Sequence, residues 1–253
     1  MTYCVAAMLK QGLLFASDTR TNAGVDHVGS FCKMRIYQRQ GDRVVVMLSA
    51  GNLATTQAMV HLLDNQDWAD TEHPTIWNTT RMYDVAQRIG DALRSVQNRD
   101  GPYLSQHSID YGASILVGGQ IAGEPCRLFN IYPQGNFIEA SPDTLYFQIG
   151  EVKYGKPILD RVLTWETPLS DAAKCTLISF DSTVRSNISV GLPIDLAIYH
   201  RDSLALAAPR RISENDPYYS DLRAGWGQGL RGVFSGLPNP DWIPTRPDAS
   251  RIG

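Results

Sequence analysis

The sequence opens with Met1-Thr2-Tyr3-Cys4 and stays apolar to Leu9, turns at Lys10-Gln11-Gly12, and runs through Leu13-Leu14-Phe15-Ala16-Ser17 to Asp18-Thr19-Arg20. Two short apolar runs on either side of a glycine-containing turn predict a β-hairpin. Pairing of the two strands brings Asp18, at the end of the second, back beside Thr2, at the start of the first. The opening stretch therefore predicts a carboxylate next to the beginning of the chain.

Thr2 becomes a candidate catalytic residue if Met1 is removed. Methionine aminopeptidases remove the initial Met when the next side chain is small, and Thr qualifies. Processing leaves a free α-amine and a β-hydroxyl on one residue, which can act as general base and nucleophile. The reference pKa of an α-amine is about 7.7–8.0, so it accepts a proton near neutral pH. Taken alone, Thr2 is more simply interpreted as the first residue of a strand.

The residues around Thr2 favour the chemical interpretation. The N-terminal Thr, the Asp-x-Arg that begins at Asp18, and Lys33 in a strand-like run together resemble the proteasome β-type subunits. The segment Ser49-Ala50-Gly51, at the end of an apolar run, fits the strand, glycine turn and helix of that family. The sequences of residues 17–24 and 185–193 point to a narrower family, because they resemble the bacterial proteasome-related Anbu peptidases. This resemblance covers nearly the whole chain.

The pattern of elements is strands, two helices, strands, two helices and a late strand. Residues 21–30 are expected to be a loop, and Asn52 is a good helix N-cap. Apolar residues at helical spacing predict a helix from Met82 to near Asn98 and another over residues 171–182. The resemblance implies an α+β fold, a four-layer αββα sandwich of two antiparallel sheets flanked by helices.

The chain is expected to divide into a proteasome β-type N-terminal-nucleophile (Ntn) hydrolase domain, residues 1–212, and a C-terminal extension, residues 213–253. In the extension, Asp216-Pro217 opens a possible helix that several glycines weaken, and a Pro-rich stretch follows. The extension could pack on its own core or on a neighbouring subunit. We favour the neighbour, because the resemblance implies assembly.

The resemblance also implies site roles. Thr2 Oγ would be the nucleophile, Lys33 paired with Asp18 would favour loss of its proton, and the N–H of Gly51 would stabilise an oxyanion. The substrate-binding candidates beside them are Arg20, Thr21 and Ala50. Without Thr2, Asp18 and Lys33 would simply be a structural ion pair, and Gly51 a turn glycine.

One part of the family pattern is altered. Gly150-Glu151 stands where the family has a supporting serine, so that hydrogen bond is either absent or made by Glu151. The family's Asp-x-x-Ser fits in two registers: Asp181 keeps the acid but places Val184 at the serine, and Ser186 keeps the serine but places Thr183 at the acid. We expect both Asp181 and Ser186 to lie near Thr2.

Composition excludes several other functions. The formal charge of −3 gives no electrostatic reason to expect nucleic acid or an anionic membrane. No apolar run approaches the roughly 20 residues that span a bilayer, and the N-terminus does not look like a signal peptide. The four cysteines show no CxxC pair and the five histidines no metal-ligand spacing. We expect a cytoplasmic protein with reduced thiols, no metal and no cofactor.

The sequence thus predicts a self-compartmentalising threonine peptidase that hydrolyses peptide amide bonds and forms a homo-oligomer, either a ring or an open spiral. Its substrate would be a peptide or an unfolded protein, and no motif indicates an ATPase partner. Two alternatives stay open. One is an Ntn amidase acting on a small-molecule amide. The other is a catalytically silent proteasome-like assembly protein that keeps Met1.

Overall fold

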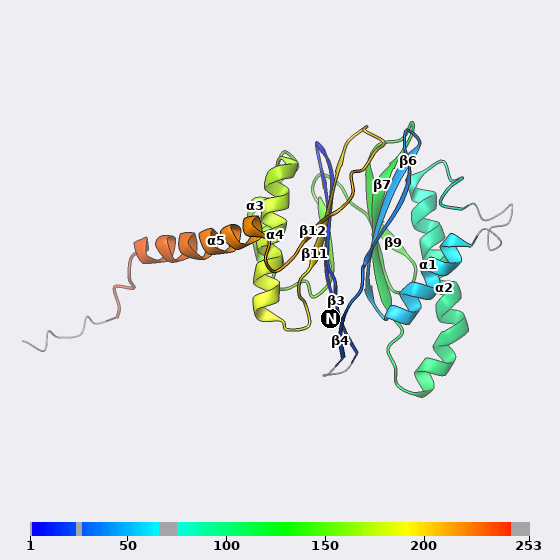
Figure 1. Ribbon diagram of the computed structural model, residues 1–253, viewed down its shortest axis with the longest axis horizontal. Helices are drawn as coiled ribbons and strands as arrows, with labels where there is room; N and C mark the ends of the chain where they lie inside the picture. Colours follow the sequence, from blue (N-terminus) through cyan, green and yellow to red (C-terminus); the bar gives the residue numbers. More distant parts are fainter. Residues whose placement is uncertain (1, 24–26, 66–74, 244–253) are drawn as a thin grey trace, which may run out of the picture.

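The computed structural model describes residues 2–23, 27–65 and 75–243. Within these ranges the strands form two five-stranded sheets and a two-stranded ribbon, and every pairing is antiparallel. Helices lie outside both sheets (Figure 1). The predicted α+β class with antiparallel sheets is confirmed.

The first sheet has the strand order β10-β1-β2-β11-β12. Its strands are β1 (Tyr3–Leu9), β2 (Gly12–Asp18), β10 (Tyr146–Gly150), β11 (Ile194–His200) and β12 (Arg210–Ile212). The opening hairpin is β1–β2, as predicted, and both of its strands are fully buried. Gly12 is required at its turn, since φ is +149° and a Cβ there would lie 2.0 Å from the carbonyl oxygen of Tyr199.

The second sheet has the order β5-β6-β7-β8-β9. Its strands are β5 (Met34–Arg39), β6 (Arg43–Gly51), β7 (Ala113–Ile121), β8 (Arg127–Ile131) and β9 (Phe137–Glu139). The ribbon consists of β3 (Arg20–Ala23) and β4 (His27–Ser30), so the expectation that residues 21–30 form only a loop is wrong. These strands are four residues long and polar, so they carry no apolar alternation that would predict pairing.

Two helices cover each sheet. Helices α1 (Leu53–Asp64) and α2 (Met82–Gln106) pack on the second sheet, and α3 (Lys156–Val162) and α4 (Leu169–Ser186) pack on the first. The predicted cap of α1 is confirmed, because Asn52 Oδ1 accepts the N–H of Thr55 at 3.1 Å.

Both long helices extend beyond their predicted ends. Helix α2 runs through Gly101 and Pro102 to Gln106, past its predicted end near Asn98. A Cβ on Gly101 would lie 3.1 Å from the ring of Tyr111, so the glycine is used for close packing. Helix α4 begins two residues earlier and ends four residues later than expected. Tertiary packing outweighs local propensity in both places.

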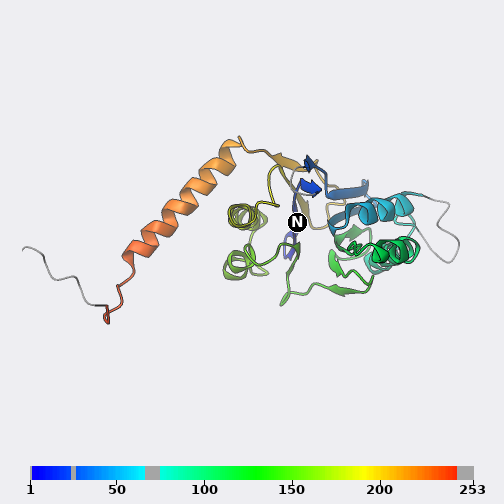
Figure 2. The ribbon, with the colours of Figure 1, turned by 90° about the horizontal axis from the view of Figure 1, so that it is seen from below.

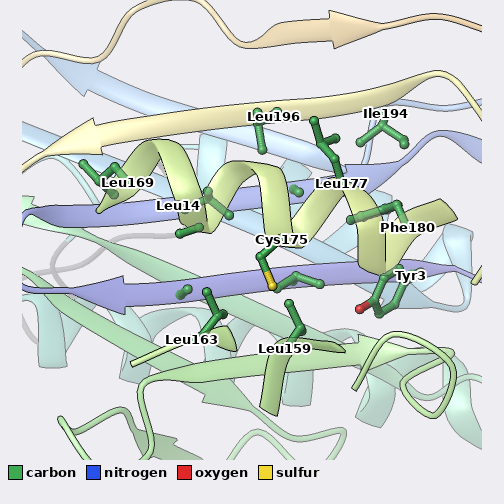
Figure 3. Close-up of a cluster of buried hydrophobic side chains, with 14 of the residues drawn as sticks. Tyr3, Leu14, Leu159, Leu163, Leu169, Cys175, Leu177, Phe180, Ile194 and Leu196 are labelled. Carbon is green, nitrogen blue, oxygen red and sulfur yellow. The ribbon is translucent and has the colours of Figure 1, made fainter. Parts of the chain in front are cut away.

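Buried apolar side chains form three clusters. One lies between the two sheets, one lies under α1 and α2, and one lies under α3 and α4. The last cluster is drawn in Figure 3, in which Tyr3 lies beside Phe180 of α4. Their ring centroids are 4.6 Å apart. The Tyr3 hydroxyl also bonds Ser179 Oγ at 3.1 Å and accepts from Gln148 Nε2 at 2.6 Å. The residue that follows Thr2 is therefore firmly anchored.

The last helix, α5 (Pro217–Gly236), begins where Asp216-Pro217 predicted a start. Asp216 Oδ1 accepts the N–H of Tyr219 at 3.1 Å, which caps the helix. Figures 1 and 2 show α5 running away from the sheets beyond α4. Among the described residues, no helix has the length and apolar content needed to cross a membrane.

Candidate active site

The register of the opening hairpin places Asp18 next to the start of the chain. Cys4 pairs with Ser17, so Asp18 lies opposite Tyr3, one residue from Thr2. Asp18 Oδ1 accepts the N–H of Tyr3 at 3.0 Å, and the residue is fully buried. The predicted placement of Asp18 is confirmed.

Lys33 connects the two sheets at this point. It immediately precedes β5 of the second sheet, and its Nζ donates to Asp18 Oδ1 at 2.6 Å and to the carbonyl oxygen of Arg20 at 2.6 Å. Both side chains of the ion pair are almost completely buried. The second carboxylate oxygen, Oδ2, accepts the N–H of Gly191 at 3.4 Å. Asp18 is therefore held by three groups from separate parts of the chain.

Burial raises the pKa of the Asp18 carboxyl, while the Lys33 ammonium and the backbone N–H groups of Tyr3 and Gly191 oppose that rise. The pair is thus costly for the fold and tolerated because each charge has a partner. An ammonium at this position stabilises any anion that forms beside it. Burial also raises the pKa of the Cys4 thiol, so the nearest cysteine stays neutral and does not compete as a nucleophile.

A cavity of about 240 Å³ opens at Thr2. Six of the nine predicted site residues line it together, namely Thr2, Arg20, Thr21, Lys33, Ala50 and Gly51. Asp18 lies behind the cavity through its bond to Lys33. The remaining lining residues are Phe31, Ser49, Leu53, Thr56 and Gly150.

The backbone at Gly51 is arranged to direct an N–H group toward this cavity. The N–H of Ser49 donates to the carbonyl oxygen of Lys33 on the β5 side. The N–H of Asn52 donates to the carbonyl oxygen of Gly112 on the β7 side. Because N–H groups alternate sides along a strand, the N–H of Gly51 points to the β5 side. Strand β5 begins only at Met34, so no residue of β5 lies opposite Gly51.

Glycine is also required at position 51. Its φ is +115°, and a Cβ would lie 2.3 Å from the carbonyl oxygen of Gly112. This conformation lets the chain leave β6 and enter α1.

The altered segment Gly150-Glu151 contacts Thr2 through its backbone. The N–H of Glu151 donates to the carbonyl oxygen of Thr2 at 2.7 Å. Gly150 has φ of +83°, and a Cβ there would lie 1.9 Å from the same oxygen. The Glu151 carboxylate, which is buried, accepts from Asn187 Nδ2 at 2.8 Å. Within the described ranges, its side chain makes no hydrogen bond to Thr2.

The structure does not bring Asp181 or Ser186 into the cavity at Thr2, where they were expected. The Asp181 carboxylate is buried but binds Arg185 Nε at 3.0 Å and Arg223 Nε of α5 at 2.7 Å. Ser186 is exposed at the last position of α4. Neither residue lines the cavity. The reason is that α4 presents residues 179, 180 and 183 to the core, which turns Asp181 toward α5.

The sequence reasoning missed the segment that follows α4. Arg20 Nη1 donates to the carbonyl oxygen of Ile188 at 2.7 Å, and its guanidinium lies where a Cβ on Gly191 would be, 2.3 Å from Cζ. Gly191 in turn donates to Asp18. The signal was present, because residues 185–193 form one of the two stretches that carry the family resemblance, but within it only Ser186 was given a role and Gly191 was not.

Antiparallel sheets that face each other, helices outside them, and a buried Asp–Lys pair behind the first threonine define a proteasome-related protein. No protein-family model matches the chain, and the comparison with curated proteins gives no match. The comparison with solved structures does. The chain belongs to the Anbu (ancestral beta-subunit) family.

Three similar structures carry this assignment. Anbu from Yersinia bercovieri is 52% identical, with 96% of this chain and 100% of that chain covered and a TM-score of 0.89. An Anbu (Gly-1) mutant from Hyphomicrobium sp. strain MC1 is 48% identical over 95% and 100% of the two chains, with a TM-score of 0.88. A helical assembly of the Anbu complex from Pseudomonas aeruginosa is 49% identical over 95% and 99%, with a TM-score of 0.90.

Proposed function

We propose that this protein is an Ntn hydrolase, specifically a threonine peptidase that becomes competent when Met1 is removed. The observation that carries the proposal is the buried Lys33–Asp18 pair, joined at 2.6 Å, beside the cavity that Thr2 lines. Burying an ion pair costs free energy that a purely structural contact could avoid with apolar residues. Its location behind a candidate nucleophile is what a chemical role requires.

In the proposed reaction, Thr2 Oγ attacks the carbonyl carbon of an amide and its proton passes to the free α-amine of the same residue. The Lys33 ammonium stabilises the developing alkoxide, and Asp18 holds Lys33 in place. The N–H of Gly51 donates to the oxyanion of the tetrahedral intermediate, where one such donor is worth about 2.7–4 kcal/mol. The amine product leaves with the proton, and water then hydrolyses the ester on Thr2, which restores the enzyme.

The proposal also covers the layered fold, the oligomeric assembly and the cellular compartment of the protein. The three clusters around two facing sheets support a four-layer αββα sandwich for residues 1–212, with residues 213–253 as an extension. The helical assembly of the Pseudomonas aeruginosa relative supports a homo-oligomer, in a ring or open spiral that would hide the sites. The four cysteines are free, which supports a reducing compartment such as the cytoplasm.

The experiment is reaction with a peptide epoxyketone, an electrophile that engages both the hydroxyl and the amine of an N-terminal threonine. We expect one adduct per chain on Thr2, seen by intact mass and peptide mapping. Thr2→Ala should give none, and Thr2→Ser should keep it. Absence of an adduct on protein that has lost Met1 would contradict the proposed nucleophile.

A second series separates the peptidase from the small-molecule amidase. The cavity of about 240 Å³ is large enough for one side chain or a small amide. Hydrolysis of peptides supports the proposed function. Hydrolysis of small amides alone, with an adduct on Thr2, would replace it with the amidase.

A further inference from the structure

The peptide group between Thr2 and Tyr3, here termed the first peptide, holds Thr2 once Met1 is removed, because no residue then precedes it. Both polar atoms of this group have partners. The N–H of Tyr3 donates to Asp18 Oδ1 at 3.0 Å. The carbonyl oxygen of Thr2 accepts the N–H of Glu151 at 2.7 Å. Since a peptide group is planar, these two bonds fix the direction in which the Cα of Thr2 leaves it.

Glu151 follows directly after β10, whose last paired residue, Gly150, lies opposite Tyr3. The side chain of Glu151 is buried, so its carboxylate depends on protein groups rather than on water. Within the described ranges, its one hydrogen bond comes from Asn187 Nδ2 at 2.8 Å. Lys153, whose side chain is 69% exposed, approaches the other carboxylate oxygen only to 3.9 Å. Asn187 is therefore the principal anchor of the Glu151 side chain.

Asn187 is itself fixed at the end of α4, where it is the C-cap. Its N–H donates to the carbonyl oxygen of Thr183 at 2.9 Å. Its side-chain oxygen, Oδ1, accepts the N–H of Ser189 at 2.9 Å. Because Ser189 occupies the acceptor end of the amide, the donor end is directed to Glu151.

The segment that begins at Asn187 also reaches the other partner of the first peptide. The N–H of Gly191 donates to Asp18 Oδ2 at 3.4 Å. Glu151 and Asp18, which bond the two sides of the first peptide, are thus connected through residues 187–191. The result is a closed ring of hydrogen bonds around the start of the mature chain.

We propose that Glu151 and Asn187 are positioning residues for Thr2. Asn187 holds Glu151, whose N–H keeps the first peptide, and with it the Thr2 hydroxyl and amine, in the orientation needed for attack. The inference rests on the proposed function and deepens it, since it assigns the support that the altered Gly150-Glu151 segment provides. Such support matters because a misplacement of about 1 Å can slow a reaction about 100-fold.

The test is the rate constant for inactivation at saturating peptide epoxyketone, measured on protein that has lost Met1. Glu151→Ala and Asn187→Ala each remove the anchor. We expect a rate constant lower by about 10-fold or more, with the half-saturating concentration little changed. Glu151→Gln keeps an oxygen that accepts from Asn187, so it should react within about two-fold of the wild type. A Glu151→Ala variant with the wild-type rate constant would overturn the proposal.

Exchanging donor and acceptor tests the bond itself. Asn187→Asp keeps an oxygen that accepts from Ser189 but sets two carboxylates against each other, so it should be the slowest variant. Adding Glu151→Gln supplies an amide that donates to the introduced carboxylate, and the double variant should recover most of the lost rate. A double variant as slow as Asn187→Asp alone would contradict the assigned role of the bond.

Asp181→Asn is the control, because Asp181 is buried to a similar degree, 4% against 6% exposed, and lies on the same helix that Asn187 ends. It should leave the rate constant unchanged even where stability falls.

Amide hydrogen exchange at position 151 separates this inference from the proposed function, because it requires no reaction at Thr2. If the mature wild type forms no adduct, the proposed function fails. Faster exchange in Asn187→Ala than in the wild type would still support the positioning of the first peptide. Unchanged exchange would refute it, whatever the adduct shows.

Discussion

The two ends of the molecule carry opposite unfavourable features, buried charge at one end and exposed apolar surface at the other. At the N-terminal hairpin, a charged pair is buried and both oxygens of Asp18 have partners from the same chain. At the tip of α5, apolar side chains are exposed and have no such cover. Both features cost stability in an isolated chain. Under the proposed function the cost at the hairpin is offset by chemistry at Thr2, whereas among the described residues nothing covers the apolar end of α5.

The largest expected effect comes from breaking the buried pair. Lys33→Met leaves Asp18 as an uncompensated buried carboxylate, so we expect a loss of about 3–5 kcal/mol in the free energy of unfolding. The double variant Asp18→Asn with Lys33→Met should recover most of that loss. Both variants should react with the electrophile at least about 100-fold more slowly.

Chemical denaturation and adduct kinetics give the two readouts. A double variant that keeps both stability and reactivity would mean that the pair is neither structural nor chemical. That result would remove the contrast between the two ends of the molecule.

The next effect concerns the support of Asp18 from the segment after α4. In Gly191→Ala, the new methyl group would displace the Arg20 guanidinium and loosen the bond to Asp18. We expect a loss of about 1–3 kcal/mol and slower reaction of Thr2. In an Arg20→Ala background the same change should cost less, as a double-mutant cycle would show. Gly29→Ala is the control, because a Cβ there meets nothing within 4 Å.

A variant of Asp181 tests whether the α5 end of the molecule is independent of the site at Thr2. Asp181→Asn weakens its contacts with Arg185 and Arg223, so we expect a loss of about 1–3 kcal/mol and earlier detachment of α5 by hydrogen exchange. Reaction at Thr2 should not change. A drop in Thr2 reactivity at unchanged stability would restore Asp181 to the site, against its observed position.

The smallest effects are those of pH, and they have opposite signs at the two ends. Arg210 and the N–H of Tyr219 lower the pKa of Asp216, so its contribution is present above the reference value of about 3.9 and is lost as pH falls through the native pKa. Asp216→Ala should cost about 1 kcal/mol at neutral pH and less in acid.

Asp18 behaves in the reverse way. Burial raises its pKa, so its contribution is present below the reference value and is lost as pH rises through the native pKa. Relative to the double variant without the pair, the wild type should therefore lose stability over that interval. Stability curves from pH 3 to 8 check both signs, and parallel curves for the two sites would contradict them.

The parts of the fold predicted correctly are those fixed by short sequence separation. The opening hairpin needs only its glycine turn and two apolar runs, and it alone places Asp18 next to Thr2. Asn52 as a cap and Asp216-Pro217 as a helix start are equally local. The ribbon β3–β4 was missed because four-residue polar strands have no periodic signal, and α2 extends past Gly101 because a tertiary contact holds it.

The candidate site divides in the same way. Thr2, Asp18, Lys33 and Gly51 come together through hairpins and a strand end, which a family resemblance can locate in the sequence. Asp181 was misplaced because its direction depends on the rotation of α4 and on Arg223, 42 residues away. The role of Gly191 depends on a contact across 173 residues, which spacing alone does not reveal.

The most direct test of the central claim is the intact mass of the protein purified from its own host. We predict a mass that lacks Met1, and after reaction with the epoxyketone an increase that corresponds to one adduct on Thr2. That result would establish the free amine and the nucleophile together. A native chain that retains Met1 and gains no adduct would contradict the account and leave a proteasome-like assembly protein without this chemistry.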